Sequence, residues 1–164
     1  MDPLPTCDLC DQHRNDPPER FRVLPPVFRD FGGRVGFQGT VATVQCFEDN
    51  TSVREAVGSA GHGRVLVVDG GGSVRRALLG GNLAATAEKN GWAGVVIHGA
   101  VRDLQELARC RIGIRALAAM PMATEKRHAG LTDVAVQIAG VWVRPGEWLV
   151  ADEDGIVVMG ADAR

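Results

Sequence analysis

The chain has 164 residues, of which 45% are hydrophobic and 23% charged, and its formal net charge is −2. This composition is typical of a single globular domain with a core of its own, and the small negative charge excludes a general attraction to nucleic acid or anionic membrane. No apolar run reaches the length of a membrane span, and no basic segment followed by an apolar one predicts a signal peptide, so we expect a cytoplasmic protein.

Residues 1–30 are predicted to form an N-terminal arm, and residues 31–164 a single domain. Most of the eight prolines lie in the first 30 residues, where Pro17-Pro18 and Pro25-Pro26 favour extended chain. The pair Cys7-x-x-Cys10, with His13 nearby, is compatible with zinc or with a redox pair. No second close pair of ligands completes a four-ligand zinc site, so ordinary packing is the expected role.

The body of the chain begins with alternating residues at 34–47, which predict a kinked strand, and a short helix follows at 52–60. The run VLVVD at 65–69 predicts a buried strand. The glycine-rich loop 70–73 and a predicted helix at 74–79 follow it. Such a loop suggests phosphate binding, but its spacing matches neither common nucleotide-binding motif, so a close approach of the backbone to another element is favoured.

A second glycine-rich loop contains Gly80, Gly81, Asn82 and Leu83, and a helix is predicted from Leu83 to Asn90. The free N–H groups at this helix start would form an anion site, although the loop is also compatible with a plain hinge. The next strand is predicted at 94–98. Because strand, helix and strand follow one another, strands 65–69 and 94–98 should be parallel neighbours. Their carboxyl ends would then share one edge, with Arg102 in reach of the 80–83 loop.

Arg102 and Asp103 lie where the strand at 94–98 gives way to a predicted helix at 103–109. The guanidinium of Arg102 suits a carboxylate, and Asp103 offers hard oxygens for a divalent cation. Glu106 would lie on the same helical face, one turn further along. The alternative is structural: Asp103 caps the helix and Arg102 pairs with Glu106 on a solvated face. His98 is interpreted as a histidine at a strand end.

The last third of the chain is predicted to be mainly β-structure, with strands at 112–119, 133–143 (broken at Gly140), 148–151 and 155–159. The polar segment 121–132, which contains Lys126, is either a solvated loop or a lid over a substrate. The three acids at 152–154 are favoured as a turn, although such a cluster can also bind a cation.

Five segments together resemble one family, the regulator of ribonuclease E activity A (RraA) proteins and the related class II 4-hydroxy-4-methyl-2-oxoglutarate aldolases. They are FGGRVGFQGTVATVQCFEDN (31–50), GRVLVVDGGGSVRRALLGGNLAATA (63–87), GWAGVVIHGAVRD (91–103), IGIRALA (112–118) and PGEWLVADEDGIVV (145–158). The resemblance implies an α/β fold of the swivelling β/β/α type, with a central mixed sheet and a parallel β–α–β core. It also implies homotrimers with sites between subunits.

In the aldolase-like members a glycine or an acid precedes an Arg-Asp pair, with twenty residues between them, and another acid lies three residues beyond the Asp. Gly81, Arg102, Asp103 and Glu106 match this pattern. The resemblance implies that Asp103 binds Mg²⁺ or Mn²⁺, with Glu106 acting through water. It also implies that Arg102 and the backbone of residues 80–83 bind a small 2-oxo acid.

The activity implied is that of a divalent-metal-dependent lyase. It would cleave 4-hydroxy-4-methyl-2-oxoglutarate to pyruvate and decarboxylate oxaloacetate through a pyruvate enolate, with Arg102 and Asp103 as catalytic residues. The alternative is a non-catalytic inhibitor that binds endoribonuclease E. The segment SVRRAL (73–78) resembles the regulator branch, whereas Asp103, which enterobacterial regulators lack, favours the enzyme. The family has also been labelled a methyltransferase, but no strand followed by G-x-G-x-G supports that activity.

Overall fold

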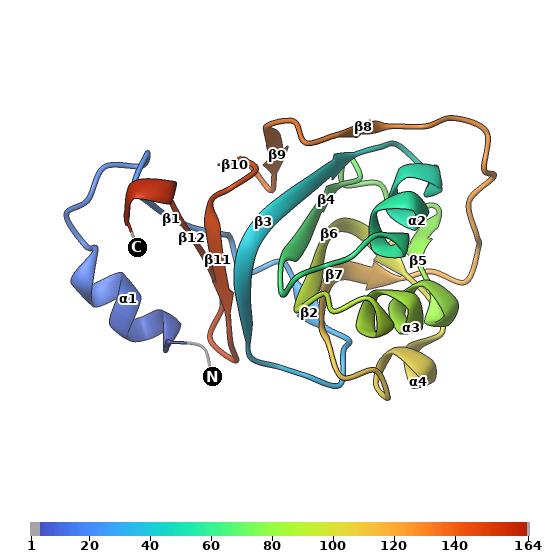
Figure 1. Ribbon diagram of the computed structural model, residues 1–164, viewed down its shortest axis with the longest axis horizontal. Helices are drawn as coiled ribbons and strands as arrows, with labels where there is room; N and C mark the ends of the chain where they lie inside the picture. Colours follow the sequence, from blue (N-terminus) through green and yellow to red (C-terminus); the bar gives the residue numbers. More distant parts are fainter. Residues whose placement is uncertain (1–3, 164) are drawn as a thin grey trace.

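The computed structural model describes residues 4–163 and is built around a curled mixed sheet (Figure 1). Its strands are β1 (Phe21–Val23), β2 (Arg29–Asp30), β3 (Phe37–Gln45), β4 (Val65–Asp69), β5 (Ala77–Leu79), β6 (Gly94–Val101), β7 (Gly113–Ala119), β8 (Leu131–Thr132), β11 (Trp148–Ala151) and β12 (Ile156–Met159). They run in the order β1-β12-β11-β3-β4-β6-β7-β2, with β5 beside β6 and β8 beside β3. A separate hairpin consists of β9 (Val136–Ile138) and β10 (Val141–Val143).

The centre of the sheet is parallel: β3, β4, β6 and β7 are successive parallel neighbours. The predicted pairing of strands 65–69 and 94–98 is confirmed, with a register that runs from Val65–Gly94 to Asp69–His98. The connecting helices α2 (Thr51–Gly58), α3 (Gly81–Lys89) and α4 (Leu104–Leu107) lie on one side of these strands (Figure 1). This arrangement is the predicted α/β fold with a central mixed sheet and a parallel β–α–β core.

Two hydrophobic clusters cover the two faces of the parallel strands. On the helix side, buried residues of α2 and α3 pack against alternate residues of the strands. This cluster includes Val53 and Val57 of α2, Ala84 and Ala87 of α3, Leu66 and Val68 of β4, and Val95 and Ile97 of β6. On the other side, Val65, Val67 and Val96 pack with Phe37 and with the β9–β10 hairpin. Burial on both faces explains why these strands read as continuous β-branched runs in the sequence.

The predicted helix at 74–79 is wrong, because residues Ala77–Leu79 form β5. Ala77 pairs with Ala100 and Leu79 with Val101 in a short parallel ladder, and all three residues of β5 are buried. Arginine, alanine and leucine favour a helix locally, but burial of three successive side chains requires neighbours on both sides, which a strand beside β6 provides. The next two helices also differ in length: α3 begins at Gly81, and α4 is confined to 104–107.

The N-terminal segment packs on the opposite edge of the molecule from α3 and α4 (Figure 1). Helix α1 (Thr6–Gln12) is held at its first residue by Asp152, whose carboxylate accepts hydrogen bonds from the N–H and hydroxyl of Thr6, both at 2.7 Å. Strand β1 pairs with β12. The 152–154 segment is a turn, as favoured from the sequence, because Asp152 also accepts hydrogen bonds from the N–H groups of Asp154 and Gly155.

The Cys7-x-x-Cys10 pair lies on α1 with both thiols free. Within residues 4–163, no group of three or more His, Cys, Asp or Glu side chains is placed to hold a metal ion, so the zinc interpretation of Cys7, Cys10 and His13 finds no ligand set. A short 3-10 helix (Ala161–Ala163) follows β12. Over the same range, no helix combines the length and the apolar character needed to cross a membrane.

Candidate active site

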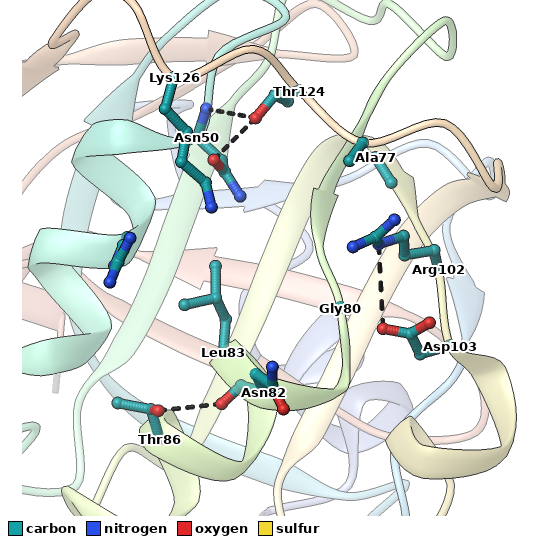
Figure 2. Close-up of a pocket in the computed structure, with 12 residues that line it drawn as sticks. Asn50, Ala77, Gly80, Asn82, Leu83, Thr86, Arg102, Asp103, Thr124 and Lys126 are labelled. Carbon is teal, nitrogen blue, oxygen red and sulfur yellow. Dashed lines mark hydrogen bonds and ion pairs between the residues drawn. The ribbon is translucent and has the colours of Figure 1, made fainter.

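A cavity of about 310 Å³ opens at the carboxyl edge of the parallel strands (Figure 2). In open α/β sheets this edge is where ligands bind, and the volume suits a small metabolite. The cavity is lined by Asn50, Arg54, Ala77, Gly80, Asn82, Leu83, Thr86, Arg102, Asp103, Ala123, Thr124 and Lys126. Five residues of the predicted site, Gly80, Asn82, Leu83, Arg102 and Asp103, are among them.

The pairing of β5 with β6 brings the 80–83 loop and Arg102 together. The N–H of Arg102 donates to the carbonyl of Leu79 at 3.0 Å, so the residues that follow both strands emerge side by side. Gly80 is the N-cap residue of α3 and Gly81 its first helical residue. The structure thus places the start of α3, with its partial positive charge, beside the Arg102 guanidinium. That juxtaposition is the one predicted from the order of strands and helices.

Asp103 does not cap its own helix. It occupies the N-cap position of α4 in the left-handed conformation (φ 59°, ψ 48°) and makes no side-chain capping hydrogen bond there. Aspartate tolerates this backbone conformation better than most residues. The turn directs the carboxylate back toward α3, where its Oδ2 accepts a hydrogen bond from the N–H of Gly81 at 2.9 Å. Asp103 therefore belongs to the cavity, and the structural alternative for this residue is not what the structure shows.

Arg102 is also oriented within the site. Its Nε lies 3.9 Å from Asp103 Oδ2, and its Nη1 donates to the carbonyl of Pro121 at 3.4 Å. The alternative pairing with Glu106 is therefore replaced by a pairing with Asp103. The two side chains are 43% and 39% exposed, so both remain accessible from the cavity. A guanidinium held in this way presents a planar set of donors to an incoming carboxylate.

Two carboxylates approach positions 80 and 81 so closely that they leave no space for a side chain, and both positions hold glycine. A Cβ at position 80 would lie 2.6 Å from Asp103 Oδ2, and one at position 81 would overlap the Glu106 carboxylate. Glu106, the remaining member of the predicted motif, thus lies against the first residue of α3. The spacing of Gly81, Asp103 and Glu106 in the sequence reflects a direct contact between the start of α3 and the acids around α4.

The opposite wall of the cavity comes from residues that the sequence did not predict as a site. The side-chain amide of Asn50 accepts a hydrogen bond from the Thr124 hydroxyl at 2.7 Å (Figure 2). It also donates to the carbonyl of Leu78 at 3.2 Å. Asn50 follows β3, at the same carboxyl edge as Arg102. Ligands bind beyond the carboxyl ends of the parallel strands. Had this rule been applied to the predicted strand at 34–47 as well as to the one at 94–98, it would have indicated Asn50.

Asp49 binds the segment that carries Lys126 through hydrogen bonds to its backbone. Its Oδ2 accepts hydrogen bonds from the N–H groups of Arg127 (2.6 Å) and His128 (2.9 Å), and its Oδ1 accepts both the N–H and the hydroxyl of Thr51. Burial on its own would raise the pKa of Asp49, but the hydrogen bonds outweigh it and hold the pKa well below its usual range. The 121–132 segment is therefore tied to the start of α2 and forms part of the cavity wall.

Two other features of interest from the sequence lie apart from this cavity. His98 is not among its lining residues; its Nε2 accepts a hydrogen bond from the N–H of Ala139 at 3.3 Å. The 70–73 loop leads into β5 and not into a helix. It therefore lacks the helix start that would bind a phosphate.

Comparison with known protein families gives a match over most of the chain. The RraA-like family model, described as Aldolase/RraA, matches residues 6–158. The chain is therefore a member of the RraA-like family, as the resemblance of its segments predicted.

Individual relatives cover the chain nearly end to end. A protein of Albidiferax ferrireducens named "Putative 4-hydroxy-4-methyl-2-oxoglutarate aldolase" is 66% identical in a match of 161 residues that covers 93% of this chain and 93% of that one. The structure of the RNA-processing inhibitor RraA from Thermus thermophilis is 50% identical, covers 96% of this chain and 93% of that one, and superposes with a TM-score of 0.90. An S-adenosylmethionine: 2-dimethylmenaquinone methyltransferase from Geobacillus kaustophilus HTA426 is 43% identical, with coverage of 96% and 95% and the same TM-score.

Proposed function

We propose that the protein is a divalent-metal-dependent lyase that cleaves 4-hydroxy-4-methyl-2-oxoglutarate to pyruvate and also decarboxylates oxaloacetate. The observation that carries the proposal is the convergence of Arg102, Asp103 and the start of α3 on one small cavity. The high identity to a relative named as an aldolase gives the substrate class.

The donor set fits a hard cation. Asp103 Oδ2 accepts the Gly81 N–H, whereas its Oδ1 has no hydrogen-bond partner among residues 4–163 and the side chain is 39% exposed. Mg²⁺ commonly takes one or two protein carboxylates and keeps several waters. Asp103 would hold Mg²⁺ or Mn²⁺ directly, and Glu106 would act through water. When bound, the cation supplies Lewis-acid polarisation of the 2-oxo group.

The protein's own groups bind and orient the 2-oxo acid. Arg102 offers its fork to the carboxylate next to the 2-oxo group, and the N–H groups at the start of α3 add partial positive charge. Cleavage breaks the C3–C4 bond and leaves its electron pair on the enolate of one pyruvate. The 4-hydroxyl loses its proton as the carbonyl of the second pyruvate forms, and C3 of the enolate then takes up a proton. Arg102 stabilises the negative charge while it develops.

Oxaloacetate decarboxylation uses the same features. Loss of CO₂ from C4 leaves the same enolate next to Arg102, so a site built for one reaction supports both. The two activities should therefore respond in parallel to a change at Asp103.

The substitution Asp103→Ala tests the proposal. We expect Mg²⁺-dependent release of pyruvate from either substrate to fall by at least about a hundredfold, while the far-UV circular dichroism spectrum and the oligomer size stay unchanged. Asp133→Asn is the matched control, because Asp133 is an exposed aspartate that does not line the cavity and also has a positive φ (54°). Equal turnover in Asp103→Ala and wild type would refute the assignment.

A second function is favoured by the close similarity to the RNA-processing inhibitor RraA. The protein would bind an endoribonuclease E and inhibit it without catalysis. Co-purification with ribonuclease E at micromolar concentration tests this function directly. If wild type shows no metal-stimulated turnover but retains the ribonuclease, the binding function replaces the enzymatic one.

A further inference from the structure

Four short segments form the edge of the parallel sheet that lies opposite the cavity. They precede the four parallel strands and comprise residues 33–36 before β3, 59–64 before β4, 89–93 before β6 and 108–112 before β7. Backbone hydrogen bonds join them across this edge: the N–H of Gly63 donates to the carbonyl of Gly91, that of Gly113 to Ala93 and that of Gly33 to Cys110. The four segments therefore make one continuous surface, which we call the amino edge.

The amino edge carries basic side chains and no acidic one. Its four segments contain no Asp or Glu, and their five cationic residues are Arg34, Arg64, Lys89, Arg109 and Arg111. Glu88 directly precedes the third segment, and the ends of α2, α3 and α4 that point here each add a partial charge of about −0.5. These contributions offset about half of the five positive charges. The amino edge thus remains positive on a chain whose net charge is −2.

No carboxylate among residues 4–163 neutralises these five cations. Four of them are exposed and make no side-chain hydrogen bond or ion pair with the described part of the chain. The fifth, Arg64, donates only to two backbone carbonyls, and the centre of its guanidinium lies 4.8 Å from the centre of the Trp92 ring. Exposed arginines elsewhere do pair with acids, as Arg14 does with Asp11. The cations of the amino edge are therefore available to an external anion.

The amino edge offers charge but no apolar anchor. None of the large hydrophobic side chains that are exposed among residues 4–163 lies in its four segments, and Trp92 is only 4% exposed. A protein partner needs an apolar or aromatic centre in its interface, and stable attachment to a membrane needs apolar groups that insert. Single-stranded nucleic acid stacks its bases on exposed aromatic rings. The backbone of a nucleic-acid duplex needs only cations, which hold its phosphates.

The dimensions of the amino edge also suit a duplex. Neighbouring strands are about 4.8 Å apart, so the row of four segments is about 15 Å long. A duplex carries one negative charge per about 1.7 Å of its axis, which places about nine phosphates opposite this row. Each of the five cations therefore has a phosphate within its range. Four of the five are arginines, whose planar fork fits phosphate oxygens in pairs.

We propose that the amino edge binds the phosphate backbone of a nucleic-acid duplex, DNA or RNA, without regard to sequence. The net charge of the whole chain does not reveal this surface, because the fold gathers cations from four separate segments at one edge. The surface lies at the other end of the parallel strands from the cavity, so it does not depend on the proposed function. We expect weak binding, with Kd of about 10⁻⁵ M, as is ordinary for contacts to phosphates alone.

Fluorescence anisotropy with two labelled duplexes, one of DNA and one of RNA with the same sequence, tests this surface. The logarithm of the association constant should fall linearly with the logarithm of the salt concentration, with a slope of about −4.5 for five phosphate contacts. In Arg109→Gln/Arg111→Gln the affinity at low salt should fall about ten- to a hundredfold, and the slope should become shallower by about two. Comparison of the two duplexes identifies which nucleic acid is the better ligand.

The matched control is Arg14→Gln/Arg20→Gln, which removes the same charge from two exposed arginines of the N-terminal segment. That segment lies on the other side of the molecule from α3 and α4 (Figure 1). The control should keep the affinity and the salt slope of wild type. Both double variants should release pyruvate at the wild-type rate, because none of the four arginines lines the cavity.

The outcomes separate this inference from the proposed function. Failure of wild type to bind either duplex at low salt, or an Arg109→Gln/Arg111→Gln variant that binds like wild type, overturns it. Equally tight binding of poly-L-glutamate would overturn the choice of partner, since an acidic polypeptide would then serve as well. A wild type that binds a duplex through Arg109 and Arg111, yet releases no pyruvate, keeps the surface and refutes the lyase.

Discussion

The loops at 70–73 and 80–83 both contain consecutive glycines and both follow a buried strand, but different groups approach them. In the first loop, Gly70 lies against Leu78 and Gly72 against the ring of His98. In the second, Gly80 lies against Asp103 and Gly81 against Glu106. The first loop also has a carboxylate partner, because Asp69 accepts a hydrogen bond from the N–H of Gly71 at 2.8 Å. The difference lies in the space that the missing side chains leave, which Leu78 and His98 fill in the first loop and two carboxylates at the edge of a cavity fill in the second.

The reason for the glycines also differs between the loops. Gly71 and Gly72 have positive φ values of 68° and 74°, so they are needed for the turn itself. Gly80 and Gly81 have no such backbone conformation; in this chain a side chain at either position would instead meet Asp103 or Glu106. A glycine-rich loop therefore indicates a site only when polar groups occupy the space that the missing side chains leave.

Among substitutions in the two loops, Gly81→Ala is expected to have the largest effect. The new methyl group must displace Glu106, and changes in groups that support a metal ligand typically cost ten- to a hundredfold in activity. We therefore expect kcat/KM for pyruvate release to fall by about that factor, with little change in thermal stability. Steady-state kinetics at saturating Mg²⁺ measures it.

Two further variants isolate the cause. Gly58→Ala adds the same methyl group in α2, where a Cβ meets nothing within 4 Å, and should leave kcat/KM unchanged. In a double-mutant cycle, Gly81→Ala should cost much less on a Glu106→Ala background. Full additivity of the two effects would show that the methyl group acts through something other than Glu106.

Gly71→Ala is expected to act on stability and not on activity. A left-handed alanine costs about 1 kcal/mol, which corresponds to a fall in Tm of about 2–4 °C for a chain of this size. The nearest side chain, Phe47, would lie 2.9 Å from the new Cβ but is 61% exposed and free to move. Differential scanning calorimetry and the pyruvate assay together check the prediction. A loss of turnover larger than that of Gly81→Ala would reverse the roles assigned to the two loops.

The smallest effect concerns His98, which packs beside the first loop. Burial lowers its pKa below the ordinary value, against the opposing influence of the Asp69 carboxylate. Because its pKa is lowered in the folded protein, His98 binds a proton more readily in the unfolded chain than in the folded one. The His98 contribution to the free energy of unfolding is therefore constant above the unfolded pKa of about 6.5 and declines as the pH falls below it.

Substituting His98→Gln removes that pH-dependent part. Denaturant unfolding at pH 7 and pH 5 should show a smaller loss of stability in the variant than in wild type. The protonated ring could no longer accept the Ala139 N–H, which fixes the direction of the effect. An equal loss in both proteins would mean that other groups account for the acid sensitivity.

The sequence predicted the parallel core because continuous β-branched runs such as Val65–Val68 form strands wherever both faces are buried. It also predicted that Arg102 would meet the 80–83 loop, from the expected pairing of strands 65–69 and 94–98. The contact itself is made through β5, a strand that the sequence did not predict. The segment at 74–79 was missed because its helix-forming residues are overridden by pairing with β6, a contact that local propensity does not contain.

The second wall of the cavity was harder to predict for a different reason. Asn50 and Thr124 are separated by 74 residues, and the contact between them depends on the path of the segment after β7. Lys126 in isolation looks like any solvated lysine. Its place in the cavity wall follows only from the hydrogen bonds of Asp49 and Asn50, which hold the segment against the start of α2.

Pyruvate release from 4-hydroxy-4-methyl-2-oxoglutarate, measured before and after removal of divalent cations with a chelator, tests the central claim most directly. The account predicts that wild type loses turnover with the chelator and recovers it when excess Mg²⁺ or Mn²⁺ is added back. Undiminished turnover in the chelator, or no turnover with either metal, would contradict it.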